Sequence, residues 1–553
     1  MRRLLLLLHT VRYLKIQQLV YRVYYRFSKP RLKKRPAPEM RGVITAWSGP
    51  NFILPATDDG KSFTFLGETG YLQYGWNNPA FSKLWLYNLH YQDDLNAVGA
   101  DGRSAVCQQL VENWIDANPP LQGNGWEPYC LSLRIVNWVK WLSRLQADEV
   151  DPRWLSSLAC QANALAQQLE FHILANHLFA NAKALVFAGS FLGGKQGDAL
   201  LGRGVRLLDQ QVPEQFLADG AHYELSPMYH ATLLWDMCDL VQLQQQTRLV
   251  ALDQRKTLWR RVITHGISWL RKMVHPDGDI AFFNDATLGI APTLKQLEGY
   301  AGQLGCVPEP ISRNADFAPL QLCHLKSSGY VVIDWAEGHR ALLDAAKVGP
   351  GYQPGHAHAD TLSFELSLFG QRVFVNSGIS QYGEDTERHR QRSTAAHNTL
   401  EVDGENSSEI WAGFRVARRA KPIDLAIRQQ EGYIRVDAAH DGYQRLPGKV
   451  LHQRQWLAKP SELVIEDQLS GDFKQAKAYF HLHPDVRLEQ VDGNHLQGNL
   501  AQCQVFNLSF EGGIVETQAG SWHPAFGVSL PNNCVVVTLQ ASELKTQISW
   551  RDV

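Results

Sequence analysis

The spacing of apolar residues changes once along this 553-residue chain, and that change limits the folds it can adopt. From about residue 80 to 315, apolar residues recur every three or four positions, as in "LRIVNWVKWLSRLQ" and "ATLLWDMCDLVQLQQQ", which is typical of amphipathic helices. After about residue 320 they alternate, as in "GYVVIDWAE" and "NCVVVTLQ", which indicates short strands. Helices first and strands second predict two packed domains rather than an interleaved α/β fold.

The predicted fold class is therefore multidomain α+β. We expect an N-terminal helix with an irregular lead-in over 1–75, an all-α domain of helical hairpins over 76–318, and an antiparallel β-sandwich over 319–553. The length agrees with this division, because a chain of this size is too long for one hydrophobic core. Ligand sites favour the junction between such domains.

Composition excludes some partners. The chain is 44% hydrophobic and 20% charged, with a formal net charge of -1, as in a soluble globular protein. It has no overall basic excess to neutralise a phosphate backbone, so we predict no nucleic-acid partner. The eight cysteines are scattered without a CxxC pair, which favours free thiols and a reducing compartment.

The N-terminus, "MRRLLLLLHTVRYLKIQQLVYRVYYRF", combines leucines with basic residues. Its apolar run, 4–8, is too short for a secretory signal and far short of the ~20 residues of a membrane span. An amphipathic helix here could contact an anionic membrane surface, but we expect a surface helix packed on its own domain. We favour a cytoplasmic or membrane-associated location and leave the periplasm open.

The segment "GHAHADTLSFELSLFG" (355–370) places two histidines before an alternating apolar run. If a strand begins at His356, then His356, His358 and Asp360 share one face with the apolar residues that follow. Partly shielded imidazoles at such a position suit a metal ligand or a catalytic base. Two hydrogen-bonded histidines at a strand end are the simpler interpretation.

Three further segments carry chemically useful side chains. Asn176 and His177 are adjacent polar residues in the apolar helix "EFHILANHLFANAKAL", and "DGAHYELSPMYHATLLWDM" contributes Glu224, Tyr229 and His230. The third segment, "RHRQRSTAAHNTLEVDG", contains the remaining candidates, which are Arg388, Arg392 and His397. Each alone has a structural explanation, as a hydrogen-bonded core residue, a helix cap or a solvated charge. Their conjunction indicates a reaction site.

These segments resemble the heparinase II/III-like polysaccharide lyases, relatives of the oligoalginate lyases. The resemblance extends from about residue 65 onward, and its most specific pieces are "WEPYCLSLRIVNWVKW", "ANH", "DGAHYELSPMYH", "GHAHADTLSFEL" and "RSTAAHNTLEVDG". It implies an N-terminal α/α toroid, an incomplete barrel of helical hairpins, followed by a C-terminal antiparallel β-sandwich. It also implies β-elimination on an anionic polysaccharide that contains uronic acid.

The resemblance implies roles for individual residues. Asn176, with His177, would hydrogen-bond the uronate carboxylate, so that the negative charge of the intermediate is stabilised. Tyr229 would be the acid and, in some members, also the base, whereas His356 is the alternative base. The residues expected to bind substrate are Arg134, Glu224, His230, Arg388 and Arg392.

The resemblance also implies one structural zinc ion and no organic cofactor. Its ligands would be His358, a position that is an aspartate in relatives and reads Asn376 here, and His397. A neutral amide is a poorer zinc ligand than a carboxylate. A weaker site, completion by Asp360 or water, and an empty site all stay open.

Three functions remain to be compared. The first is a polysaccharide lyase linked to capsule or exopolysaccharide metabolism, and the second is a non-catalytic glycan-binding or assembly protein of polysaccharide biosynthesis. A glycoside hydrolase would need two carboxylates, for which Glu224 and Asp236 are candidates. Hydrolysis would leave the Asn, His and Tyr cluster unexplained.

Overall fold

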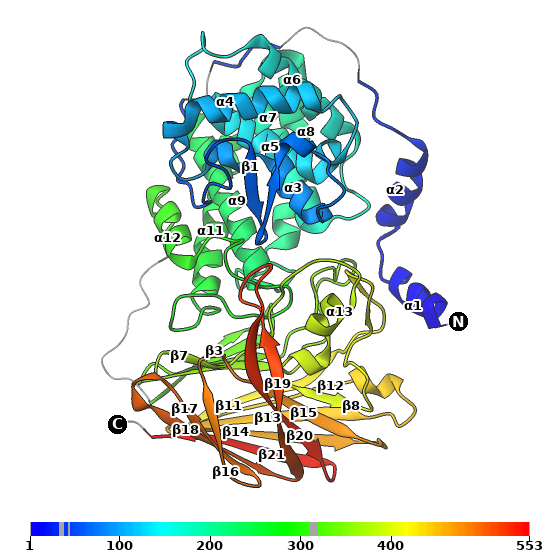
Figure 1. Ribbon diagram of the computed structural model, residues 1–553, viewed down its shortest axis with the longest axis vertical. Coiled ribbons are helices and arrows are strands. Elements are labelled where there is room, and N and C mark those ends of the chain that lie inside the picture. The colour runs from blue at the N-terminus through cyan, green and yellow to red at the C-terminus, as the bar shows by residue number, and fades with distance from the viewer. Residues whose placement is uncertain (1, 33–37, 43–44, 309–318, 552–553) are drawn as a thin grey trace.

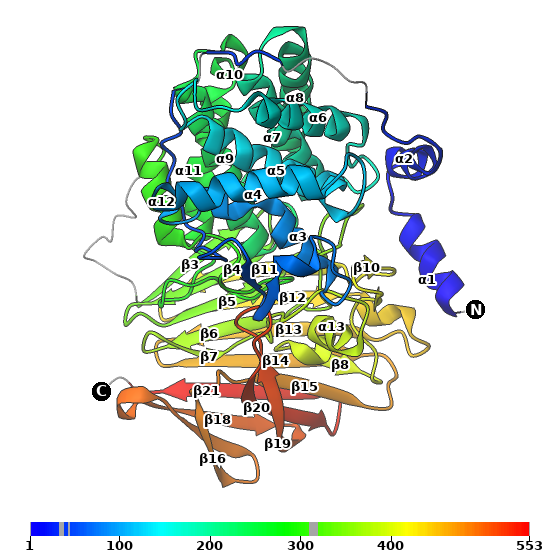
Figure 2. The same ribbon diagram turned by 45° about the horizontal axis from the view of Figure 1, so that its top comes forward.

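The computed structural model describes residues 2–32, 38–42, 45–308 and 319–551. It confirms the predicted fold class: a helical domain lies on a domain of antiparallel sheets (Figures 1 and 2). The predicted boundary at residue 318 falls outside the described residues. Among the described residues, no helix is both long and apolar enough to cross a membrane.

The helical domain is built from consecutive packed helices, among which α7 and α8 form one close pair and α5 packs on α7. A small hairpin of β1 (Ser62–Phe65) and β2 (Glu68–Tyr71) precedes them. The helices are α3 (Lys83–Tyr91), α4 (Ser104–Ala117), α5 (Pro128–Leu142), α6 (Pro152–Gln167), α7 (Ala175–Phe191), α8 (Gly194–Gln215), α9 (Pro227–Gln246), α10 (Val250–Asp253), α11 (Lys256–Leu270) and α12 (Leu294–Gln303).

A five-stranded sheet lies directly below the helical domain (Figure 2). Its strands are antiparallel and follow chain order: β3 (Leu320–Leu325), β4 (Tyr330–Trp335), β5 (Arg340–Asp344), β6 (Phe364–Leu368) and β7 (Gln371–Phe374). In β4, Val331 and Ile333 join the core of the sheet domain, whereas Tyr330 and Val332 join the helical core. The sheet is therefore buried on both faces and connects the two domains.

Two larger sheets complete the second domain. The eight-stranded sheet has the order β11 (Pro422–Gln430), β12 (Tyr433–His440), β13 (Leu451–Lys459), β14 (Glu462–Ser470), β21 (Glu543–Trp550), β18 (Val505–Glu511), β17 (His495–Asn499), β16 (Arg487–Asp492). The four-stranded sheet has the order β19 (Gly513–Trp522), β20 (Leu530–Leu539), β15 (Ala476–His481), β8 (Leu400–Val402). Strands β9 (Ile410–Trp411) and β10 (Arg415–Val416) form a separate pair, and α13 (Thr386–Arg392) precedes β8.

The polar side chains of β6 show how the domains meet. The alternating sequence places Phe364 and Leu366 in the core of the sheet domain. Glu365 and Ser367 face the other way, where His275 of the helical domain bonds both, with its ring nitrogens 2.7 Å from each side-chain oxygen. Because all five residues of β6 are buried, its alternation separates two interiors rather than an interior from solvent.

Two N-terminal helices lie outside this architecture, along one flank of the molecule (Figures 1 and 2). They are α1 (Arg2–Val11) and α2 (Ile16–Phe27). The sequence predicted one surface helix packed on its own domain. Instead α1 contacts the sheet domain, and α2 contacts the helical domain and, through Gln18, the Tyr352 carbonyl of the sheet domain.

Candidate active site at the domain junction

Asn176 and His177 lie in the first turn of α7 rather than inside the helix. The two preceding residues, Leu174 and Ala175, have φ angles of 71° and 52°, a conformation that side chains other than glycine rarely adopt. This sharp entry aims the helix N-terminus, whose free N–H groups favour anions, at the site. The backbone N–H of Asn176 donates to Glu224 Oε1 at 3.3 Å.

His177 is held by a buried carboxylate that the sequence analysis did not identify. Its Nδ1 lies 2.9 Å from Glu170 Oε1, and Asn181 fixes the other oxygen of Glu170 at 3.0 Å. Burial alone would lower the pKa of His177, but the attraction of Glu170 outweighs it and raises that pKa above its ordinary value. The imidazole is therefore partly exposed beside Asn176 and binds a proton more readily than a free histidine.

Tyr229 lies in the first turn of α9, where the Ser226 hydroxyl caps the helix by accepting from the Tyr229 N–H at 3.2 Å. The Tyr229 ring stacks on His356 with 3.8 Å between ring centroids. Its hydroxyl is 2.9 Å from the Tyr382 hydroxyl. Burial, with the neighbouring Tyr382 and Asp285, raises the pKa of Tyr229 well above its ordinary value. The phenol thus keeps its proton and suits an acid better than a base.

His356 and His358 lie in the loop between β5 and β6, so the predicted strand start at His356 is wrong. Strand β6 begins at Phe364, because Leu362 turns the chain with a φ of 65°. The two histidines nevertheless converge. His356 Nδ1 lies 2.9 Å from Asp285 Oδ2, and His358 Nε2 lies 2.7 Å from Asp285 Oδ1.

Asp285 is the centre of this junction, although it comes from a loop of the helical domain. Two guanidinium nitrogens of Arg388 donate to the Asp285 carboxylate oxygens at 2.5 and 2.7 Å, and neither side chain is exposed. Burial would raise the pKa of Asp285, but Arg388 and the two histidines outweigh it and hold that pKa well below its usual range. Arg388 therefore positions a carboxylate inside the protein, which corrects its predicted contact with substrate.

The remaining nitrogen of His356 completes a continuous cluster. An ionised carboxylate only accepts hydrogen bonds, so His356 donates from Nδ1 to Asp285 and leaves its Nε2 lone pair free. Nε2 lies 3.6 Å from Glu224 Oε2, a buried oxygen without a hydrogen-bond partner. Asn176, Glu224, His356 and Tyr229 are thus linked contact by contact, and His356 comes from the opposite domain.

Arg134 is not available to a sugar. Its guanidinium donates to Gln161 Oε1 at 2.9 Å and to the carbonyls of His90 and Gly125 at 2.9 and 2.6 Å. It also stacks on Trp114, and none of it is exposed. These three bonds join segments of the first domain around a fully buried guanidinium, so the predicted substrate contact is corrected to a structural role.

His230 and Arg392 are likewise interior. His230 Nδ1 accepts from the His222 N–H at 3.0 Å, and its Nε2 lies 2.9 Å from the Gly266 carbonyl. Arg392 donates to the carbonyls of Ala357 and Gly413 at 2.9 Å each. Both side chains are fully buried, so their predicted roles in substrate binding are also corrected.

A group with metal-ligand character lies behind Asp285. His358 Nδ1 and His397 Nε2 are 3.0 Å apart, and an Asp360 oxygen lies within 4.8 Å of both. The amide oxygen of Asn376, the predicted third ligand, accepts from the Asn398 N–H at 3.3 Å. Of the options that the sequence left open, the geometry favours Asp360 as the carboxylate ligand.

Asp236, the second carboxylate that a glycoside hydrolase would need, is paired with a lysine. Asp236 is bound to the ammonium of Lys183 at 2.5 Å, and Asp239 shares that cation at 2.5 Å. A carboxylate held in this way is not free to activate water.

The residues that sequence reasoning missed are those that hold others in place. Asp285 follows two phenylalanines in "FFNDA", a segment that gave only a turn signal, and Glu170 precedes a phenylalanine in "LEFHILANH". Tyr382, in "SQYGED", gave no signal at all. The only hint of Asp285 and Glu170 in the sequence was an acidic residue within two positions of an aromatic one.

The fold and the junction define a protein with a helical toroid on an antiparallel β-domain and a polar cluster between them. Two family models match: "Heparinase II/III N-terminus" over residues 103–304 and "Heparinase II/III-like, C-terminal" over 319–551. The chain belongs to the heparinase II/III-like family.

Two relatives illustrate its range. FtsZ-localized protein C of Caulobacter vibrioides is 26% identical over 428 residues, which cover 73% of this chain and 69% of the relative. A heparin-sulfate lyase of Bacteroides thetaiotaomicron is 22% identical over 374 residues, which cover 59% of this chain and 51% of the relative. The match thus spans about half the length of that relative. The crystal structure of heparinase III is 17% identical, with a TM-score of 0.69 over 97% of this chain and 89% of that one, and supports the fold.

The Glu170–His177 pair gives the first prediction. In Glu170→Gln the attraction is lost and burial dominates, so the pKa of His177, raised in the native protein, should fall below the ordinary value of about 6.5. In the native protein, the stability that protonated His177 contributes should be fully present below the ordinary histidine pKa. It should decline as the pH rises through the raised pKa of His177. NMR titration of the His177 ring measures the shift.

The exposed pair of Asp492 and His495 supplies the matched control, because its carboxylate is in solvent. Asp492→Asn should leave the titration of His177 unchanged. An unaltered His177 pKa in Glu170→Gln would contradict the electrostatic account.

Proposed function

We propose that this protein is a polysaccharide lyase that cleaves a uronic-acid-containing anionic polysaccharide by β-elimination, in capsule or exopolysaccharide metabolism. The observation that carries the proposal is the continuous cluster of Asn176, Glu224, His356 and Tyr229 across the domain junction. The heparin-sulfate lyases among its relatives support the reaction class.

The first task of such an enzyme is to stabilise the substrate carboxylate as it gains negative charge. The Asn176 side-chain amide at the N-terminus of α7 and His177, whose pKa Glu170 raises, are the donors assigned to this task. The amide donates at every pH, whereas the imidazole adds a positive charge when it is protonated. This arrangement lowers the energy of the carbanion-like intermediate.

Proton transfer follows from the hydrogen-bond directions. His356 Nε2, with Nδ1 tied to Asp285, takes the proton alpha to the carboxylate, and the released electron pair forms the carbon–carbon double bond. The glycosidic carbon–oxygen bond breaks, and Tyr229 gives its proton to the departing oxygen. Glu224 is buried like the corrected arginines, so with Oε2 3.6 Å from His356 Nε2 and Oε1 accepting from the Asn176 N–H it holds these two residues in place rather than binding the sugar.

Elimination leaves an unsaturated sugar, so product formation is visible as near-ultraviolet absorbance. We expect absorbance to rise with at least one polymer in a screen of alginate, heparan sulfate, hyaluronan, chondroitin and bacterial capsule polymers. Tyr229→Phe and His356→Ala should each lower the rate by about 100-fold or more, since each removes one positioned proton transfer.

Tyr433→Phe is the matched control, because the Tyr433 hydroxyl lies in the exposed hairpin between β11 and β12, where it donates to Gln430 Oε1 at 2.6 Å, and this variant should keep the native rate. Native rates in both Tyr229→Phe and His356→Ala would refute the assigned roles.

A second candidate function is a non-catalytic glycan-binding or assembly role. It is favoured by FtsZ-localized protein C, a relative whose name describes a location and no reaction. Binding of a uronate polymer without any absorbance change would support this candidate over the lyase.

We further propose that His358, Asp360 and His397 hold one zinc ion. Asp285 accepts the proton of His358 Nε2, and the Ser393 carbonyl accepts that of His397 Nδ1 at 2.7 Å. Both facing nitrogens then carry lone pairs, which repel unless a cation lies between them. Burial lowers the pKa of His358 to about 4 and that of His397 to about 3, so a proton does not fill this position near neutral pH.

A second buried histidine pair shows the contrast. His440 Nδ1 accepts from the Gly442 N–H at 3.1 Å, so its Nε2 donates to His452 Nδ1, also at 3.1 Å. His452 Nε2 then donates to Asp467 at 2.6 Å. Every nitrogen is satisfied in this pair, and no metal is needed. When bound, zinc would cross-link the loop after β5 to the segment before β8.

Metal analysis of protein purified without chelator or added zinc tests this assignment. We expect about one equivalent of zinc, lost in His397→Ala and Asp360→Asn together with a lower Tm. His452→Ala is the matched control and should lower the Tm without loss of zinc. Less than about a tenth of an equivalent in the native protein would exclude a resident zinc.

A further inference from the structure

Helices α1 and α2 turn their apolar sides away from the protein. In α2 the exposed apolar residues recur with helical spacing and include Val23 and Phe27, which are 61% and 82% exposed. In α1, Leu4 and Leu8 are 61% and 58% exposed. The outward set, here called the N-terminal face, comprises Leu4, Leu7, Leu8, Ile16, Leu19, Val20, Val23, Tyr24 and Phe27. Leu5 is 51% exposed as well, but it also lines a pocket against the sheet domain and is left out of the set. A surface helix of a globular protein normally has the opposite orientation.

The inner side of α2 accounts for its attachment without these residues. Gln18 is fully buried and donates to the carbonyls of Ile173 and Tyr352 at 3.2 and 3.3 Å. Tyr25 donates to the Leu169 carbonyl at 2.5 Å, and Tyr21 packs on Phe171. Polar and aromatic contacts therefore hold the helix in place while its aliphatic side stays outward.

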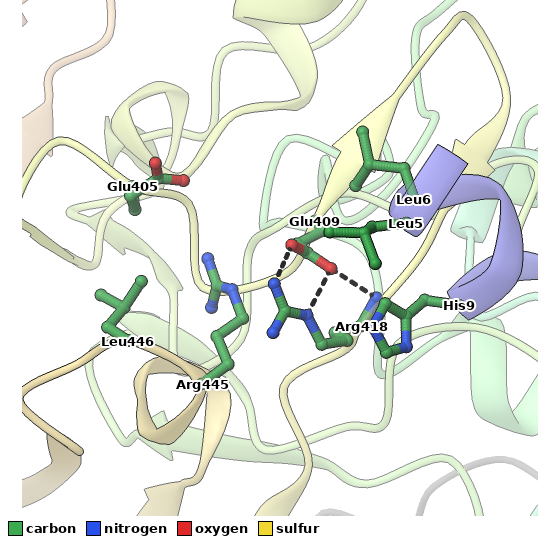
Figure 3. Close-up of a pocket in the computed structure, with 8 residues that line it drawn as sticks. All are labelled: Leu5, Leu6, His9, Glu405, Glu409, Arg418, Arg445 and Leu446. Atoms are coloured by element: carbon green, nitrogen blue, oxygen red, sulfur yellow. Dashed lines mark hydrogen bonds and ion pairs between the residues drawn. The ribbon is translucent and has the colours of Figure 1, made fainter. Parts of the chain in front are cut away.

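The inner side of α1 is attached in the same way. Figure 3 shows Leu5, Leu6 and His9 turned toward a pocket whose other wall belongs to the sheet domain. That wall comprises Glu405, Glu409, Arg418, Arg445 and Leu446. One helical turn after Leu6, the Thr10 hydroxyl accepts a hydrogen bond from the Trp411 indole N–H at 3.0 Å. Leu4 and Leu8 are not among the lining residues, and they remain exposed.

Charge identifies the kind of partner that this face fits. The first 38 residues contain eleven Lys or Arg and no Asp or Glu, whereas the rest of the chain has 43 Lys or Arg against 55 Asp or Glu. Arg3 on α1, Arg12 directly after it, and Arg22 and Arg26 on α2 are exposed. An apolar surface on two helices that carry Arg and no Asp or Glu matches the interface of an anionic bilayer.

We propose that the N-terminal face docks on the surface of an anionic lipid membrane. Its aliphatic and aromatic side chains enter the boundary between headgroups and acyl chains, and the arginines pair with lipid phosphates. The helices lie along the surface, in keeping with the absence of a spanning helix among the described residues. A second copy of the chain would oppose two strongly cationic faces, so repulsion disfavours self-association there.

The docking surface is also tied to the candidate active site. Gln18 bonds the loop that leads to Asn176 in the helical domain and the loop that leads to His356 in the sheet domain. A membrane-bound α2 would therefore hold both halves of the site next to the bilayer. The docking proposal itself does not depend on the lyase activity.

Vesicle flotation of the full chain tests the proposal directly. Vesicles of phosphatidylcholine with phosphatidylglycerol should float the protein at low salt, and vesicles of phosphatidylcholine alone should float much less of it. The double substitution Val23→Asp with Phe27→Asp should lower the partition coefficient about tenfold or more, because it removes apolar burial and adds charge of the wrong sign. Arg22→Gln should lower it about fivefold.

The matched control is Val491→Asp, since Val491 is 65% exposed on β16 but lies outside the N-terminal face. This variant should float like the native protein. No binding to the anionic vesicles, equal binding to both vesicle types, or full binding by the Val23→Asp, Phe27→Asp protein would overturn the proposal. So would a native dimer that becomes a monomer in that double variant, because the occupant would then be a second copy.

Discussion

The junction between the two domains depends on the ion pair and hydrogen bonds that the Asp285 carboxylate makes. This carboxylate comes from the helical domain, and its partners Arg388, His356 and His358 come from the sheet domain. An unpaired carboxylate at this depth would be costly, and so would an unpaired Arg388. Together they satisfy each other and set the direction of both imidazoles. The same carboxylate thus joins two domains, orients the proposed base His356 and accepts the proton of His358, a metal-ligand candidate.

Several features of the fold were predictable because they depend on local periodicity. The change from helical to strand spacing near residue 320 separated the domains, and the five matching segments indicated the family. The burial of the first sheet on both faces was not predictable, because an alternating pattern does not say whether its polar side meets water or another domain. In β6 that polar side meets His275.

The same limitation explains the errors among the candidate site residues. Arg134, His230, Arg388 and Arg392 lie in segments typical of the family, and a charged residue in such a segment suggests a contact with substrate. All four are buried, and their donors bond backbone carbonyls, Gln161 or Asp285. Sequence spacing identified the segments that build the site, but only tertiary contacts separate the groups that face a ligand from those that support them.

The account requires that Asp285 keep the Nε2 lone pair of His356 free toward the substrate position. Nitrogen-15 NMR of the His356 ring measures this property without any substrate. We expect the tautomer protonated at Nδ1 in the native protein near neutral pH, and loss of that preference in Asp285→Asn. A native His356 protonated at Nε2 would contradict the account, because no base would then face the sugar.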